Sequence, residues 1–239
     1  MTDAPNPKEL QAERRKTEER KTEERLKERL QAVEDADSAQ AMTDAVEALA
    51  ALEDEGAIDA LIRVLGYNNP GAAVAAVEGL VNIGTPAATA LLSQIDGYNY
   101  GARAWALRVL AGIGDPRALA LVLETAKEDF SLSVRRAAAR GLGSIQWEKL
   151  SKEEQQNAQR LACDALLSIV ENDPEWVVRY AGVVGLQGVA RAAKKTGDAA
   201  LVASVRKGLC DRTTKDDTIA VRARAQLAIS ELEAKTEAV

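Results

Sequence analysis

The sequence contains no histidine, only two cysteines and a single phenylalanine. Without histidine the chain lacks the usual general base at neutral pH and the commonest metal ligand, so triad hydrolases and histidine-ligated metal enzymes are nearly excluded. The two cysteines, Cys163 and Cys210, do not have the paired spacings of a disulfide framework or a zinc site. We therefore expect no metal and a reducing compartment.

Long apolar runs are also missing. No run approaches the ~20 residues that span a bilayer, and the opening "MTDAPNPKEL" lacks the apolar core of a signal peptide. We expect a cytoplasmic protein without membrane insertion. The formal net charge of −6 gives no electrostatic reason to expect a nucleic-acid partner, because phosphate binding needs an excess of lysine and arginine.

The residues that are abundant favour helices. Hydrophobic residues make up 46% of the 239-residue chain, mostly as alanine, leucine and valine, whereas aromatic residues make up 3%. This mixture suits closely packed helices better than sheets. The predicted fold class is all-α.

Residues 1–35 form a charged segment with the tandem "RKTEERKTEE" and almost no apolar residue before Leu26. Such a segment cannot bury a face, and its closely spaced opposite charges favour a solvated helix. We expect a helical or disordered extension that acts as a spacer. The alternative is an arm that docks a partner.

Internal repetition dominates the rest of the chain, residues 36–235. Five segments align without gaps, starting at Ala72, Ala102, Val134, Val178 and Val221. In each, positions 1, 5, 9 and 12 carry small or aliphatic residues and cover roughly 80° of one helical face. An apolar helix precedes each segment, so the unit is a helical hairpin. Hairpins of this kind stack, which predicts an α-solenoid of about five hairpins with a cap helix from Ser38.

The solvent-facing positions of the second helices are 3, 7 and 10, and they carry little charge. Besides Glu78, the charged residues at these positions are three arginines in neighbouring repeats, Arg108, Arg136 and Arg140. A half-apolar groove with three arginines is suited to an acidic, flat, partly apolar ligand. These residues are the main candidates for a binding site.

Other conspicuous residues have a structural interpretation. The arginines at position 2 are Arg103, Arg135, Arg179 and Arg222. Because they recur, we expect them to bridge to carboxylates or turn carbonyls of neighbouring repeats rather than to contact ligand. Trp105, Trp147 and Trp176 are interpreted as packing residues between repeats, with ring stacking as the alternative. Cys163 follows the spacing of a buried helix face.

The runs "LGYNNPGAAVAAVEGL" and "DGYNYGARAWALRVLAGIGDPRAL", together with the hairpins around them, resemble the HEAT-repeat bilin lyases of phycobilisome assembly, of the E/F type. The resemblance covers roughly residues 38–235, and residues 65–143 carry its specific part. It implies a HEAT-like fold, in agreement with the repeats.

The resemblance also implies a function. The chain would be one subunit of a heterodimer, active only with an alpha-type lyase subunit. It would bind phycocyanobilin, an open-chain tetrapyrrole, as substrate with no cofactor, and attach it by a thioether to a cysteine of the phycocyanin alpha subunit. Related isomerising lyases carry a His-Cys motif that this chain lacks, so isomerase activity is not expected. The alternative is a non-catalytic HEAT-repeat scaffold or chaperone in phycobilisome assembly or degradation.

With such a ligand, Arg108, Arg136 and Arg140 would pair with the two propionates, and the pyrrole rings would lie near flat side chains. The ring candidates are Tyr98, Tyr100, Tyr180 and Trp105. Tyr98 belongs to a "GYN" turn that repeats an earlier one at Tyr67. No catalytic residue is assigned.

Overall fold

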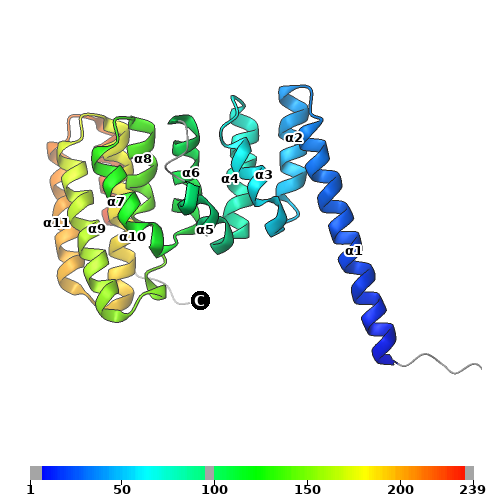
Figure 1. Ribbon diagram of the computed structural model, residues 1–239. Coiled ribbons are helices and arrows are strands. Elements are labelled where there is room, and N and C mark those ends of the chain that lie inside the picture. The colour runs from blue at the N-terminus through cyan, green and yellow to red at the C-terminus, as the bar shows by residue number, and fades with distance from the viewer. Residues whose placement is uncertain (1–6, 95–99, 235–239) are drawn as a thin grey trace, which may run out of the picture. The chain divides into compact units, whose positions relative to one another are not determined.

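The structure is a computed structural model that describes residues 7–94 and 100–234. The described residues form α-helices and short 3-10 helices and include no strand, which confirms the all-α prediction (Figure 1). The chain divides into two compact units, Met1–Ala90 and Leu91–Val239. Helix α5 (Thr85–Gln94) contains the boundary between them.

The first unit consists of hairpin-like helices in contact with one another. Its elements are α1 (Pro7–Glu34), α2 (Ala39–Ala50), η1 (Glu55–Ala57), α3 (Ile58–Val64) and α4 (Pro70–Ile83). Helix α4 packs against both α2 and α3. Leu49, Leu61 and Leu80 are fully buried where these helices meet.

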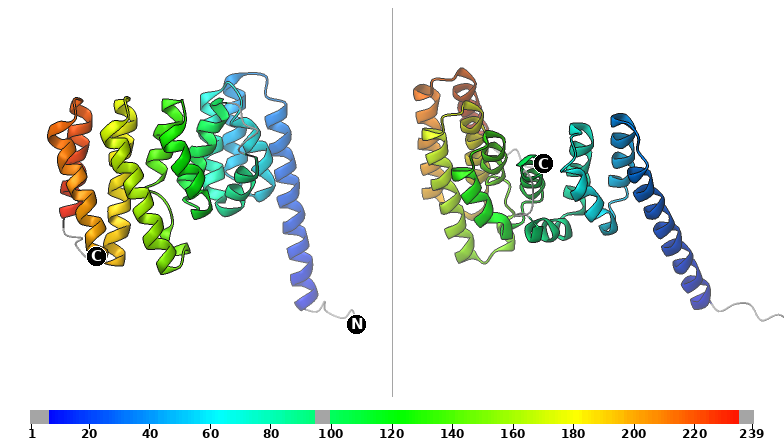
Figure 2. Two further views of the ribbon diagram at one scale, coloured as in Figure 1. Left: turned by 60° about the vertical axis from the view of Figure 1, so that its left-hand side comes forward. Right: turned by 45° about the horizontal axis from the view of Figure 1, so that its top comes forward.

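The charged extension is a helix whose C-terminal end packs. Helix α1 contacts α2 and η1, and Val33 is buried, whereas the residues of its charged tandem are exposed. The N-terminal part of α1 projects past the end of α2 (Figures 1 and 2). Ser38 begins the next helix as its N-cap, accepting a hydrogen bond from the backbone N–H of Ala41 at 3.1 Å. The predicted cap helix is α2, and it packs against both α1 and α4.

The second unit contains the remaining hairpins. Its elements are α6 (Tyr100–Ile113), η3 (Pro116–Ala118), α7 (Leu119–Glu128), α8 (Leu132–Gly141), η4 (Trp147–Lys149), α9 (Lys152–Asn172), α10 (Trp176–Thr196), α11 (Ala199–Lys215) and α12 (Ile219–Glu233). The second helices α6, α8, α10 and α12 pack in succession, and so do the first helices α7, α9 and α11. Both views of Figure 2 show these helices side by side, in two layers.

The predicted stripe of the second helices is the core. Val134 and Ala138 in α8 and Leu142, its C-cap residue, are fully buried, and the same positions of the other second helices are buried as well. Small residues at position 8 allow close contact. A Cβ atom on Gly141 would lie 2.8 Å from the Cβ of Ala111, so α6 and α8 approach at a distance that a larger side chain would prevent.

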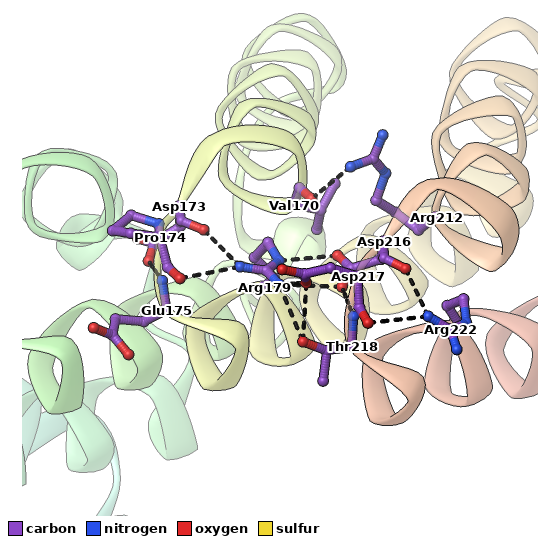
Figure 3. A network of polar contacts seen from close by, with 10 residues as sticks. All are labelled: Val170, Asp173, Pro174, Glu175, Arg179, Arg212, Asp216, Asp217, Thr218 and Arg222. Atoms are coloured by element: carbon purple, nitrogen blue, oxygen red, sulfur yellow. Dashed lines mark hydrogen bonds and ion pairs between the residues drawn. The ribbon is translucent and has the colours of Figure 1, made fainter.

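Arg103, Arg135 and Arg179, at position 2, bridge to carboxylates of the next hairpin, as predicted. Figure 3 shows Arg179 and Arg222 with the turns that they bind. Arg179 donates to the carboxylate of Asp216 in the next hairpin, at 2.9 Å from Nε and 3.1 Å from Nη2. Its Nη1 donates to the carbonyls of Asp173 and Pro174, in the turn that precedes its own helix. One guanidinium therefore ties together two successive turns.

The same arrangement extends to the neighbouring hairpins. Arg135 donates to Asp173 at 2.8 Å and also binds two carbonyls of its own turn. Arg103 lies 3.5 Å from the carboxylate of Asp129. Arg222, in the hairpin of α11 and α12, donates to the carbonyls of its own turn, those of Asp216 and Asp217. We call this series the arginine ladder.

The isolated aromatic and thiol residues have different environments. Trp147 and Cys163 are buried, as expected of packing residues. Trp176 is 45% exposed, so its interpretation as a packing residue is wrong. It is the first residue of α10.

Of the helices that the structure describes, none alone has the length and apolar composition to cross a membrane. Only α4 and α5 taken together reach both, and a bend of 120° separates them.

Candidate functional site

The open face of the second helices follows the predicted positions 3, 7 and 10. In α4, α6 and α8 these positions are exposed or half-buried, and Val74 is 47% exposed. Gln187, at position 10 of α10, is the exception. It is buried, and its side-chain amide donates a hydrogen bond to Glu231 at 2.5 Å and accepts one from Arg224.

The three candidate arginines share this face in two adjacent helices. Arg108 lies on α6, Arg136 and Arg140 lie on α8, and α6 packs against α8. All three side chains are exposed. Partial burial lowers the pKa of Arg108, and the positive charges of Arg136 and Arg140 lower it further. The structure therefore brings the predicted cluster together within Coulombic range.

A tryptophan supports the first of these arginines. The guanidinium carbon of Arg108 lies 4.2 Å from the centroid of the Trp105 ring, one helical turn earlier. A cation held over an aromatic face is stabilised by the ring quadrupole. Trp105 thus positions Arg108 and adds a flat apolar surface beside the cluster.

Charge pairing separates these arginines from the ladder. Arg103, Arg135 and Arg179 are in ion pairs with aspartates. Within residues 7–94 and 100–234, no ion pair involves Arg108, Arg136 or Arg140. Three guanidiniums close together without a carboxylate create a positive potential that favours binding of an anion, especially one with more than one carboxylate.

Of the three tyrosine candidates, the structure describes the side chain of Tyr180. Tyr180 is 37% exposed and occupies in α10 the position that Arg136 occupies in α8, and these two helices pack together. Tyr100 begins α6, but its side chain lies outside the described part of the chain. Tyr98 lies outside the described residues altogether. The role of all three rings stays a prediction.

The half-apolar character that the repeat phase predicts for these positions is confirmed in each unit. Val74, at position 3 of α4, is 47% exposed in the first unit, and Leu227, at position 7 of α12, is 50% exposed in the second. In the part of the chain that the structure describes, no group of three cysteine, aspartate or glutamate side chains could hold a metal ion.

Two family models match the chain. A model described as HEAT repeats matches residues 88–187, and one described as PBS lyase HEAT-like repeat matches residues 43–67. Both agree with the helical hairpins described above.

Curated relatives match over most of their length. The phycocyanin alpha phycocyanobilin lyase CpcF of Synechocystis sp. is 57% identical over 69% of this chain and 77% of that protein. The phycobilisome maturation protein of Synechococcus elongatus is 49% identical over 84% of this chain and 95% of that protein. The phycocyanobilin lyase subunit beta of Pseudanabaena tenuis is 47% identical over 89% of this chain and 75% of that protein.

A solved structure is also similar. It is the complex of CpcE and CpcF of phycocyanin lyase from Nostoc sp. PCC7120, of which one chain matches with 47% identity and a TM-score of 0.66. The match covers 73% of this chain and 99% of that one.

Proposed function

The chain belongs to the family of phycocyanobilin lyase beta subunits, and we propose that it is one subunit of a heterodimeric lyase acting on phycocyanobilin. Together with an alpha-type subunit it binds the open-chain tetrapyrrole and attaches it to a cysteine of the phycocyanin alpha subunit. Two lines support this proposal: the extent of the similarity to named lyases, and an unpaired arginine cluster on the open face.

The arginine cluster is the observation that bears most directly on the substrate. Phycocyanobilin carries two propionates, and Arg108, Arg136 and Arg140 offer guanidiniums on adjacent helices that form no ion pair with a carboxylate of residues 7–94 and 100–234. Charge-assisted hydrogen bonds between guanidinium and carboxylate are among the strongest in proteins. We assign the propionates to this cluster and one pyrrole ring to the surface beside Trp105.

The reaction needs placement more than acid–base groups. The acceptor thiol adds across an activated double bond of the bilin: a sulfur–carbon bond forms, the thiol proton passes to carbon, and no oxidant or reductant is consumed. Holding the bilin in one conformation near the thiol supplies proximity and orientation, which contribute several kcal/mol to such reactions. Phycocyanobilin is the substrate in this scheme, no cofactor takes part, and the reaction takes place in the cytoplasm.

The second candidate function is a scaffold that binds phycobilisome components without ligating bilin. It is favoured by the fold alone, because HEAT arrays serve many binding roles. The two functions differ in one product. Incubation with the alpha-type subunit, phycocyanobilin and the apo phycocyanin alpha subunit gives a covalent fluorescent adduct if the chain is a lyase subunit, and binding without an adduct if it is a scaffold.

The role of the cluster is tested by charge reversal with two substrates. We expect the variant R108E/R136E/R140E to lower kcat/KM for phycocyanobilin by on the order of 100-fold while the heterodimer still forms. Phycocyanobilin dimethyl ester has no propionate charge, so its weaker attachment should not be affected by the same variant.

A control variant carries the same change of charge elsewhere. Arg63, Arg160 and Arg206 are exposed residues in other parts of the fold, and R63E/R160E/R206E should ligate bilin at the normal rate. Normal ligation by the cluster variant would refute the propionate assignment. An equal loss with the dimethyl ester would show that the substitutions act on something other than propionate binding.

A further inference from the structure

Three large apolar side chains lie exposed at the starts of second helices in the second unit. Leu132 begins α8, Trp176 begins α10 and Ile219 begins α12. Their exposed fractions are 44%, 45% and 73%. We call these three residues the apolar edge row.

The row follows the repeat. Each member lies two residues before position 1 of its motif, that is before Val134, Val178 and Val221, all fully buried. Since α10 packs against both α8 and α12, the three helix starts are neighbours along one edge of the second unit. Packed helices lie about 10 Å apart, so the row extends over roughly 20 Å.

Local folding does not account for these residues. The first position of a helix favours proline, and the first unit has Pro70 there, at the start of α4. In a hydrophobic staple the residue before the N-cap packs against the fourth helical position. The row lies at the first helical position, and the fourth holds a ladder arginine such as Arg135, so the row belongs to no staple. The exposed part of each side chain contributes no packing within the second unit, and its exposure carries a cost in water.

The arginine ladder holds the row in a fixed place. Arg179 binds the carbonyls of Asp173 and Pro174, just before Trp176, and the carboxylate of Asp216, just before Ile219. Figure 3 shows Arg179 between these two turns. Because the turns are fixed by buried hydrogen bonds, a protein that binds here loses little entropy in ordering them.

We propose that the apolar edge row is a docking surface for the second subunit of the lyase. The inference rests on the proposed function, since it takes its occupant from the two-subunit assembly of a similar structure, the complex of CpcE and CpcF. Permanent interfaces are more apolar than transient ones, so a row that is rigid, regular and apolar fits a permanent partner better than a protein substrate. An exposed tryptophan between two aliphatic residues also has the composition of an interface anchor.

The test measures binding to the alpha-type subunit. We expect L132S/W176S/I219S to weaken the heterodimer on the order of 100-fold, measured by isothermal titration calorimetry. The control Y67S/L161S removes side chains of similar exposure, 44% and 49%, from other surfaces, and should bind the subunit like the unsubstituted chain. Circular dichroism and thermal unfolding of both variants check that the fold is kept.

The outcomes separate this inference from the proposed function. If the unsubstituted chain binds no alpha-type subunit, the proposed function fails. If it binds but the row variant binds equally well, the docking surface is wrong and the proposed function stands. Loss of binding only to the phycocyanin alpha subunit, or only of self-association, would also overturn the inference, because the row would then serve a different partner.

Discussion

The guanidinium of Arg179 and the carboxylate of Asp216 form a buried, two-point ion pair between successive hairpins, with side-chain exposures of 9% and 1%. Removing one partner leaves the other charge buried and unpaired. We expect R179A to lower the free energy of unfolding by about 3–5 kcal/mol, measured by urea denaturation. The exposed pair of Lys215 and Asp211 supplies the control, and K215A should cost less than about 1 kcal/mol. Equal effects would mean that the ladder does not hold the hairpins together.

The same pair predicts acid sensitivity. Burial tends to raise the pKa of Asp216, but the hydrogen bonds from Arg179 and from the Thr218 backbone outweigh it, so the pKa is lowered from its ordinary value of 3.8. A depressed pKa in the folded state means that the unfolded state binds more protons, so this stability is present above about pH 4 and is lost as pH falls through the folded pKa.

Denaturation curves between pH 6 and pH 3 measure this loss. We expect D216N to be less stable than the unsubstituted chain at pH 6 and to change less between pH 5 and pH 3. D164N, a substitution of an exposed residue on α9, should keep the full acid dependence. If D216N retains that dependence too, other carboxylates cause the acid sensitivity.

The repeat could be predicted from the sequence because its determinants are local. Positions 5 and 9 carry small or aliphatic residues in each motif, which predicts that they are buried. Ala106 and Leu110 are examples that the structure confirms. The sequence predicts that the ladder arginines bind carboxylates or turn carbonyls, but the prediction does not name the carboxylates. An aspartate precedes each of Arg135, Arg179 and Arg222 by six residues, and this spacing could have identified the carboxylates.

The candidate site could be predicted only in part. The phase of Arg108, Arg136 and Arg140 places them on one face, but the stacking of Arg108 on Trp105 depends on side-chain conformation, which the pattern does not fix. The exposure of Trp176 was missed because it depends on where α10 starts. Its neighbours in sequence, Glu175 and Val177, do not reveal that boundary.

Close contact between α10 and the end of α8 predicts a strong effect at one glycine. A Cβ atom on Gly188 would lie 2.2 Å from the carbonyl oxygen of Gly143, a backbone atom that cannot move without shifting the chain around it. We expect G188A to destabilise the chain by about 3 kcal/mol. Gly197 has a positive φ of 76°, but a Cβ atom added there would meet no atom within 4 Å, so G197A should cost about 1 kcal/mol. Thermal unfolding of both variants compares them, and a similar cost for each would argue against the close contact.

The two thiols should differ in reactivity. Burial raises the pKa of Cys163 to about 12, with a further contribution from Asp164, whereas Cys210 is exposed. Since the thiolate is the reactive form, we expect the native chain to react with one equivalent of a disulfide reagent at pH 8 and the urea-unfolded chain with two. C210S should leave the native chain unreactive. Two rapid equivalents in the native chain would contradict the burial of Cys163.

Trp105 should affect bilin binding through Arg108. The ring stabilises the guanidinium that lies over it by about 0.5–1 kcal/mol if the contact resembles other exposed cation–π pairs, so W105L should weaken phycocyanobilin binding to the heterodimer by about 2–5-fold. A double-mutant cycle separates positioning from direct contact. If Trp105 acts only by holding Arg108, W105L should have no further effect in the R108A background, because the group that it positions is gone. An equal loss in both backgrounds would mean that the indole itself contacts the tetrapyrrole, and absorbance titration with phycocyanobilin distinguishes the two results.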